Sequence, residues 1–93
     1  MPPNVQIIWD DEPGQNVDHV AEHGLTPDEV DEVIRNPDYE IDVSRRPPHL
    51  PCKFGWTITG KLIFVVWSVE FEEPLTIYPQ TAYEVPERGG EYP

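Results

Sequence analysis

The chain has 93 residues, of which 18 are acidic and six are Lys or Arg, and its formal net charge is −12. We expect residues 1–93 to form a single domain with a polar tail from about residue 82. So much negative charge repels nucleic acid at long range, which argues against the broad basic surface of a typical nucleic-acid-binding protein. The longest apolar run, Leu62 to Trp67, is far shorter than the roughly 20 residues of a membrane span. We therefore expect no membrane association. Cys52 is the only cysteine, so no internal disulfide can form, and we expect a cytoplasmic protein.

Two short helices are predicted in the first half of the chain. Apolar residues recur at helical spacing over residues 16–23, with Asn16 as the expected N-cap and Gly24 as the residue that ends the helix. Thr26 is the expected N-cap of the second helix, and Glu29 completes a capping box with it. This second helix is predicted to end before the following Asn-Pro pair.

The rest of the chain shows the two-residue periodicity of strands. The predicted strands cover residues 5–9, 39–43, 54–58, 62–69 and 75–78. The pair Thr59-Gly60 predicts a tight turn, and the strand that follows it is apolar on both faces, which is typical of a central strand. The order β-α-α-β-β-β-β predicts an α+β fold, with an antiparallel sheet of about four to five strands and two helices packed on one face.

Two short patterns resemble catalytic motifs but are better explained otherwise. The string His19-Val20-Ala21-Glu22-His23 matches H-x-x-E-H of zinc peptidases, but the chain is much shorter than those enzymes and such a short string arises by chance. Cys52 has His49 as its nearest base, and we expect a structural cysteine rather than a nucleophile. The chain also lacks a phosphate loop and a dinucleotide fingerprint, so we expect neither a metal nor another cofactor.

Four of the six Lys and Arg residues lie in an acid-free stretch, residues 43–69. Arg45 and Arg46 point to opposite faces if the preceding strand stays regular, whereas Lys53 and Lys61 flank the predicted hairpin and could converge. Converging cations stabilise the charge that builds on a phosphate when a ribose 2′-hydroxyl attacks it, and this chemistry needs no metal. The alternative is that these bases are only solvated and pair with the surrounding acids.

Several strings, in order along most of the chain, resemble the BrnT-type ribonuclease toxins of bacterial toxin–antitoxin pairs, within the RelE-like superfamily. They are Trp9-Asp10, Asn16, His23-Gly24-Leu25, TPDEVDEVI followed by Pro37, TGKLIFVVW, and LTIYPQTAYEV, with Glu87 and Tyr92 in the tail. The resemblance implies a compact fold of sheet and helices and cleavage of RNA without a cofactor. It also implies a DNA-binding antitoxin as the neutralising partner.

The resemblance carries over Lys61, His23 and one of the two adjacent arginines as site residues. The predicted catalytic set is Arg45, Arg46, Lys53, Lys61 and His23. The chain departs from the family where Asp11 follows the Trp-Asp pair and where Glu22 precedes His-Gly, since family members tend to have lysines there. These replacements favour an alternative function, a non-catalytic protein-interaction module of the same fold that has lost basic catalytic residues.

The two functions require different surfaces. A ribonuclease needs cations that converge over a cleft, whereas an interaction module needs an exposed apolar or strand-edge surface. A solvent-facing Phe71 or Tyr83 would favour the module. A small core and a continuous apolar strand also predict a homodimer, or a surface that a partner covers.

Overall fold

A computed structural model describes residues 4–85 of the chain. The helices are α1 (Asn16–Glu22) and α2 (Pro27–Arg35), and the strands are β1 (Gln6–Ile7), β2 (Ile41–Val43), β3 (Pro51–Trp56), β4 (Leu62–Glu72) and β5 (Leu75–Glu84). This confirms the predicted α+β class and the order β-α-α-β-β-β-β. Within residues 4–85, no helix is long and apolar enough to cross a membrane.

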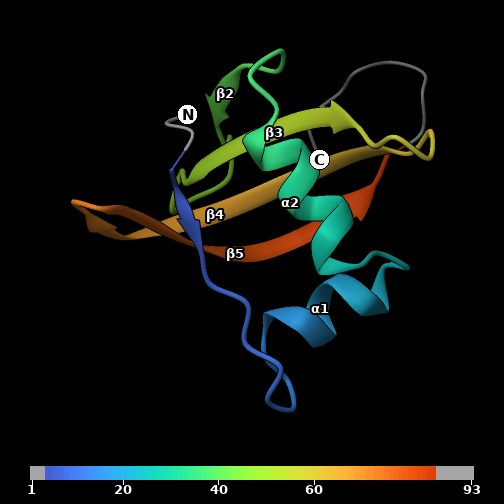
Figure 1. Ribbon diagram of the computed structural model, residues 1–93, viewed down its shortest axis with the longest axis horizontal. Coiled ribbons are helices and arrows are strands. Elements are labelled where there is room, and N and C mark those ends of the chain that lie inside the picture. The colour runs from blue at the N-terminus through green and yellow to red at the C-terminus, as the bar shows by residue number, and fades with distance from the viewer. Residues whose placement is uncertain (1–3, 86–93) are drawn as a thin grey trace.

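The five strands form one sheet in the order β1-β5-β4-β3-β2. The pairs β2–β3, β3–β4 and β4–β5 are antiparallel, whereas β1 runs parallel to β5. Strand β4 has a partner along each edge, which confirms its predicted central place. Helix α1 lies against β5 and α2 against β3 and β4, so both helices cover the same face of the sheet (Figure 1).

Helix α2 has the predicted capping box at its start. The Glu29 backbone N–H donates to Thr26 Oγ1 at 3.2 Å, and the Thr26 backbone N–H donates to Glu29 Oε1 at 3.0 Å. The side chains of Val30, Val33 and Ile34 are fully buried against the sheet. The local cap and the apolar stripe together explain why this segment was predictable from its sequence.

Helix α2 approaches β3 most closely at Gly55. A Cβ atom at this position would lie 2.7 Å from Val33 Cγ1 and 2.6 Å from Tyr39 Cδ2. Both distances are well below van der Waals contact, so only glycine fits here without a shift of the helix or of the tyrosine ring.

Asn16 does not have its predicted role as the N-cap of α1. The cap position is Gln15, and the Asn16 side chain lies one residue inside the helix, where it is almost fully buried. Its amide nitrogen donates to Ile8 O at 2.9 Å and to Pro79 O at 3.1 Å, and its amide oxygen accepts from the Asp10 N–H at 2.8 Å. Asn16 therefore ties the segment before α1 to the middle of β5.

Strand β5 is longer than the sequence predicted. It continues through Pro79 to Glu84, and Ala82 is buried in the core. Pro79 is accommodated because it lies beside a bulge, where the regular ladder of hydrogen bonds is interrupted. Strand β5 thus includes residues 82–84 of the segment predicted as a polar tail. Glu87 and Tyr92, which contribute to the family resemblance, lie outside the described residues.

Candidate functional site

Lys53 points from β3 toward the helices and is 1% exposed. Its ammonium donates to Ile34 O at 2.8 Å and to Asn36 O at 2.7 Å, two carbonyls at the C-terminal end of α2. Burial lowers the pKa of Lys53 below the ordinary value. The structure thus corrects the prediction for Lys53, because its charge satisfies the end of a helix inside the core and has no access to a phosphate.

Lys61 also contacts α2, at the opposite end of that helix. Its Nζ lies 2.9 Å from Glu29 Oε2 and donates to Gly24 O at 3.2 Å. Burial raises the pKa of the Glu29 carboxyl, but hydrogen bonds from Lys61 and from the Thr26 backbone outweigh this effect and lower it overall. Lys61 is therefore engaged in holding the start of α2 against the β3–β4 turn, and it does not converge with Lys53.

The two arginines of the predicted set lie in the loop between β2 and β3. Strand β2 ends at Val43, so Arg45 and Arg46 are on exposed loop positions and the alternation of a regular strand does not apply to them. The loop turns where the His49 N–H donates to Arg46 O at 2.8 Å. The positive charge of Arg46 acts on the Tyr83 hydroxyl of β5 and favours its ionised form.

His23 contacts the same tyrosine through its ring. It follows α1 as the C-cap residue, and its ring centroid is 5.7 Å from that of Tyr83. Burial raises the pKa of Tyr83, while the positive charge of Arg46 lowers it. Of the five predicted residues, His23 thus contacts Tyr83 and Arg46 acts on it electrostatically, although Tyr83 was not in the predicted set.

Tyr83 is held in place by a row of aromatic rings across the sheet, on the face away from the helices. Three aromatic residues, Phe54 on β3, Phe64 on β4 and Tyr83 on β5, lie side by side. The ring centroids are 4.6 Å apart for Phe54 and Phe64 and 5.7 Å apart for Phe64 and Tyr83.

Cys52 is completely buried, and burial raises the pKa of its thiol. A raised thiol pKa and a buried sulfur both oppose a nucleophilic role, in agreement with the structural cysteine we expected.

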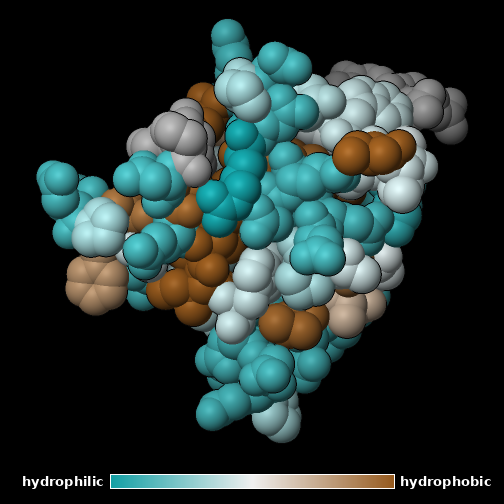
Figure 2. Space-filling view, in the orientation of Figure 1, coloured by the Kyte–Doolittle hydropathy of each residue, from teal (hydrophilic) through white to brown (hydrophobic). Residues whose placement is uncertain are grey.

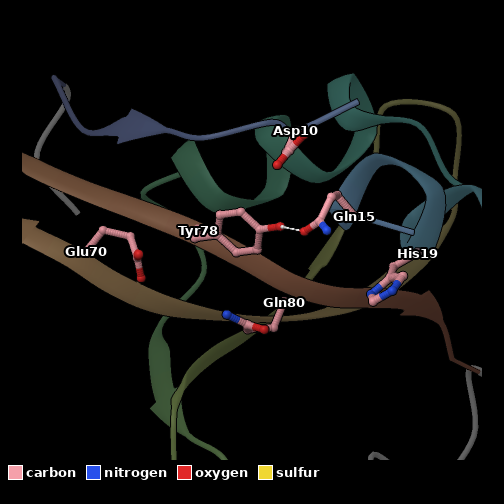
Figure 3. Close-up of a pocket in the computed structure, with 6 residues that line it drawn as sticks. All are labelled: Asp10, Gln15, His19, Glu70, Tyr78 and Gln80. Atoms are coloured by element: carbon pink, nitrogen blue, oxygen red, sulfur yellow. Dashed lines mark hydrogen bonds between the residues drawn. The ribbon is translucent and has the colours of Figure 1, made fainter. Parts of the chain in front are cut away.

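A second polar site lies at the junction of α1 with β4 and β5. It is a pocket of about 370 Å³ lined by Asp10, Gln15, His19, Glu70, Tyr78 and Gln80 (Figure 3). The Tyr78 hydroxyl donates to Gln15 Oε1 at 3.1 Å. On the strand side, Gln80 Nε2 donates to Ser68 Oγ, and Ser68 Oγ donates to Glu70 Oε2, each at 2.9 Å.

Two β-bulges bring side chains of β4 and β5 into this pocket. Val69 pairs with Ile77 but Phe71 pairs with Thr76, so Glu70 is an extra residue on β4. In the same way the pairing passes over Gln80, which is the extra residue on β5. A bulge re-aims the side chain of its extra residue, and here both extra residues line one pocket.

Sequence reasoning missed this pocket. The one available signal was Pro79, since proline within a strand favours a neighbouring bulge or an edge position. Among residues 4–85, no group of three or more His, Cys, Asp or Glu side chains is arranged to hold a metal ion.

No protein-family model matches the chain, and neither a curated protein nor a solved structure matches it significantly. The fold and the sites define a small α+β domain with a strongly acidic composition, a His23–Tyr83 contact and a separate polar pocket. The BrnT resemblance therefore continues to rest on the ordered strings in the sequence.

Proposed function

We propose that the protein is a non-catalytic protein-interaction module with a BrnT-like fold, acting as the partner-binding component of a toxin–antitoxin-type pair. The exposure of Phe71 carries this proposal. Its side chain is 66% exposed near the end of the β4–β5 hairpin, and Val69 beside it is 44% exposed. A large aromatic side chain in this position gains most when a partner covers it.

The charges around Phe71 indicate what kind of partner fits. Glu70, Glu72 and Glu73 surround it along the hairpin, and residues 69–75 contain no Lys or Arg. Figure 2 shows a largely hydrophilic face on which apolar groups are exposed in small areas, one of them toward the hairpin of β4 and β5. An apolar contact within acidic surroundings favours a partner segment that is apolar at its centre and rich in Lys and Arg at its rim.

Two of the cations predicted to be catalytic are already bound to other groups of the protein, which also supports a non-catalytic role. Lys53 and Lys61 use their charges on the two ends of α2. A ribonuclease would need them over the scissile phosphate, where each contact typically contributes about 100-fold or more in rate.

Co-expression tests this function. A tagged form of the chain is produced together with the product of the gene next to its own, which we expect to be a basic DNA-binding protein, and the two are expected to purify as a complex. Phe71→Ser should reduce recovery of that partner, whereas Ile58→Ser, a change at a 92% exposed residue of the other hairpin, should not. Absence of the complex, or equal recovery with both variants, would contradict the proposal. Sedimentation of the protein alone then distinguishes a homodimer formed through the same hairpin.

A second function, metal-independent cleavage of RNA, is supported by the His23–Tyr83 contact together with the charge of Arg46. The His23 imidazole contacts the Tyr83 ring, and the charge of Arg46 acts on the Tyr83 hydroxyl. Groups of these three types can transfer a proton and stabilise a charged phosphate. The test is incubation of the purified protein with mixed RNA at low salt in the presence of a chelator. Cleavage that His23→Ala and Arg46→Ala both abolish would establish the ribonuclease and displace the interaction module, whereas intact RNA would exclude the second function.

A further inference from the structure

We propose that the pocket at the junction of α1, β4 and β5 binds a guanidinium group, and that its ligand is an arginine side chain. The inference deepens the proposed function, on which it rests for the source of the arginine, a basic partner. The pocket itself is argued from its lining, its construction and its size.

The pocket is lined by polar side chains and contains no Lys or Arg, although the imidazole of His19 faces it. Asp10 and Glu70 supply carboxylates, and Gln15 and Gln80 supply amide oxygens. Glu70 is hydrogen-bonded to Ser68 through one oxygen, and a carboxylate has about four acceptor directions, so it retains capacity for further donors. A site with this many acceptors and two negative charges favours a cationic ligand with several N–H donors.

The pocket is also assembled from parts that are held in place. Asn16 fixes the backbone next to Asp10 and Gln15: it accepts from the Asp10 N–H and donates to Ile8 O and, through a buried hydrogen bond, to Pro79 O. The two bulges turn Glu70 and Gln80 toward the same space from neighbouring strands. Although exposed, Glu70 and Gln80 are restrained by their hydrogen bonds to Ser68, so they lose less freedom on binding than unrestrained side chains would.

Tyr78 favours a guanidinium over an ammonium. Figure 3 shows its ring in the middle of the pocket, with Glu70 on one side and His19 on the other, and its hydroxyl directed at Gln15. A guanidinium is planar, stacks on an aromatic ring and donates in a fixed fork to carboxylate and amide oxygens, whereas an ammonium is a compact and strongly hydrated point charge.

The size of the pocket suits one side chain rather than a large ligand. Its volume of about 370 Å³ is near the lower end for small-ligand pockets, which are usually apolar. The pocket also lies beside an exposed aromatic residue, because Glu70 directly precedes Phe71 in the chain. A small polar pocket in this position fits a single side chain that projects from a bound protein segment. The same partner segment could then place an arginine in the pocket and an apolar residue on the phenylalanine.

The test is a titration of the whole ¹⁵N-labelled chain with N-acetyl-arginine amide, followed by amide chemical shifts. Saturable shifts are expected at Glu70, Tyr78 and Gln80. N-acetyl-citrulline amide has nearly the same shape without the charge, and it should bind about tenfold or more weakly. Glu70→Gln should weaken arginine binding to a similar extent, and the matched control Glu72→Gln, two residues away on the exposed hairpin, should leave it unchanged.

Equal binding of citrulline, no shifts, or shifts that are spread over all acidic residues and insensitive to Glu70→Gln would overturn the inference. The outcome is separable from that of the co-expression experiment. Arginine binding without a co-purified partner would retain the pocket and refute the proposed function, whereas a captured partner without arginine shifts would refute the pocket alone.

Discussion

Replacement of Lys53 by methionine separates a structural role of this residue from a catalytic one. Lys53→Met keeps most of the aliphatic stem but removes the ammonium, and with it the hydrogen bonds to Ile34 O and Asn36 O. The first of these contacts is buried and the second is partly buried, so water can replace the second more easily than the first. A buried carbonyl without a donor costs about 1–3 kcal/mol, and we expect a loss of stability of that order.

The loss is measurable as a shift in the thermal unfolding midpoint. For a domain of this size, about 1 kcal/mol corresponds to roughly 4–8 °C, so Lys53→Met should melt roughly 5–20 °C below the parent. Lys61→Met is the matched control, since it removes the same charge from an ion pair that is partly exposed and therefore worth only about 0–1 kcal/mol. Equal midpoints for the parent and Lys53→Met would refute the capping role of Lys53.

The comparison of the parent with Lys53→Met also predicts how the stability of the protein depends on pH. Burial lowers the pKa of Lys53 in the folded state from its ordinary value of 10.5, so the folded protein releases this proton more readily than the unfolded chain. The unfolded state then holds more protons, and stability rises with pH between the lowered pKa and 10.5. The stability of the parent relative to Lys53→Met should therefore increase through this range, as measured by urea unfolding at a series of alkaline pH values.

Three further outcomes test the fold. Thr26→Ala should destabilise the protein by about 1 kcal/mol in urea unfolding because it breaks the capping box, and an unchanged midpoint would contradict the assigned start of α2. Gly55→Ala should cost about 1–3 kcal/mol, and the double variant with Val33→Ala should lose less than the sum of the two single changes, because the shorter side chain makes room for the new methyl group; additive effects would contradict the close packing. The thiol of Cys52 should react with a disulfide reagent only as fast as the protein unfolds, and rapid labelling of the native state would refute its burial.

The elements that were predictable are those whose signals are local. The capping box of Thr26 and Glu29 lies within four residues, and the central place of β4 follows from its apolar composition on both faces. The class and the order of elements could therefore be derived from the sequence, although the parallel pairing of β1 with β5 was not anticipated.

The features that were missed depend on how distant segments meet. Lys53 has the same local sequence whether it faces water or the end of α2, and only the packing of that helix on β3 determines which occurs. The pocket depends on the pairing register of β4 with β5, which neither strand specifies alone. Tyr83 was named only as an indicator of exposure, because its contact with His23 joins residues 60 positions apart.

The two bulges make the pocket unusually sensitive to chain length. Each is a single extra residue, so loss of one codon, at Gln80 or at Glu70, would convert an irregular stretch of the β4–β5 ladder into a regular one and remove a wall of the pocket. Conversely, insertion of one residue into a strand of a regular hairpin would create a bulge, and the side chain of the extra residue could line a new pocket. Ligand recognition at this end of the sheet can therefore be gained or lost by small insertions and deletions, without any exchange of the core side chains beneath α2.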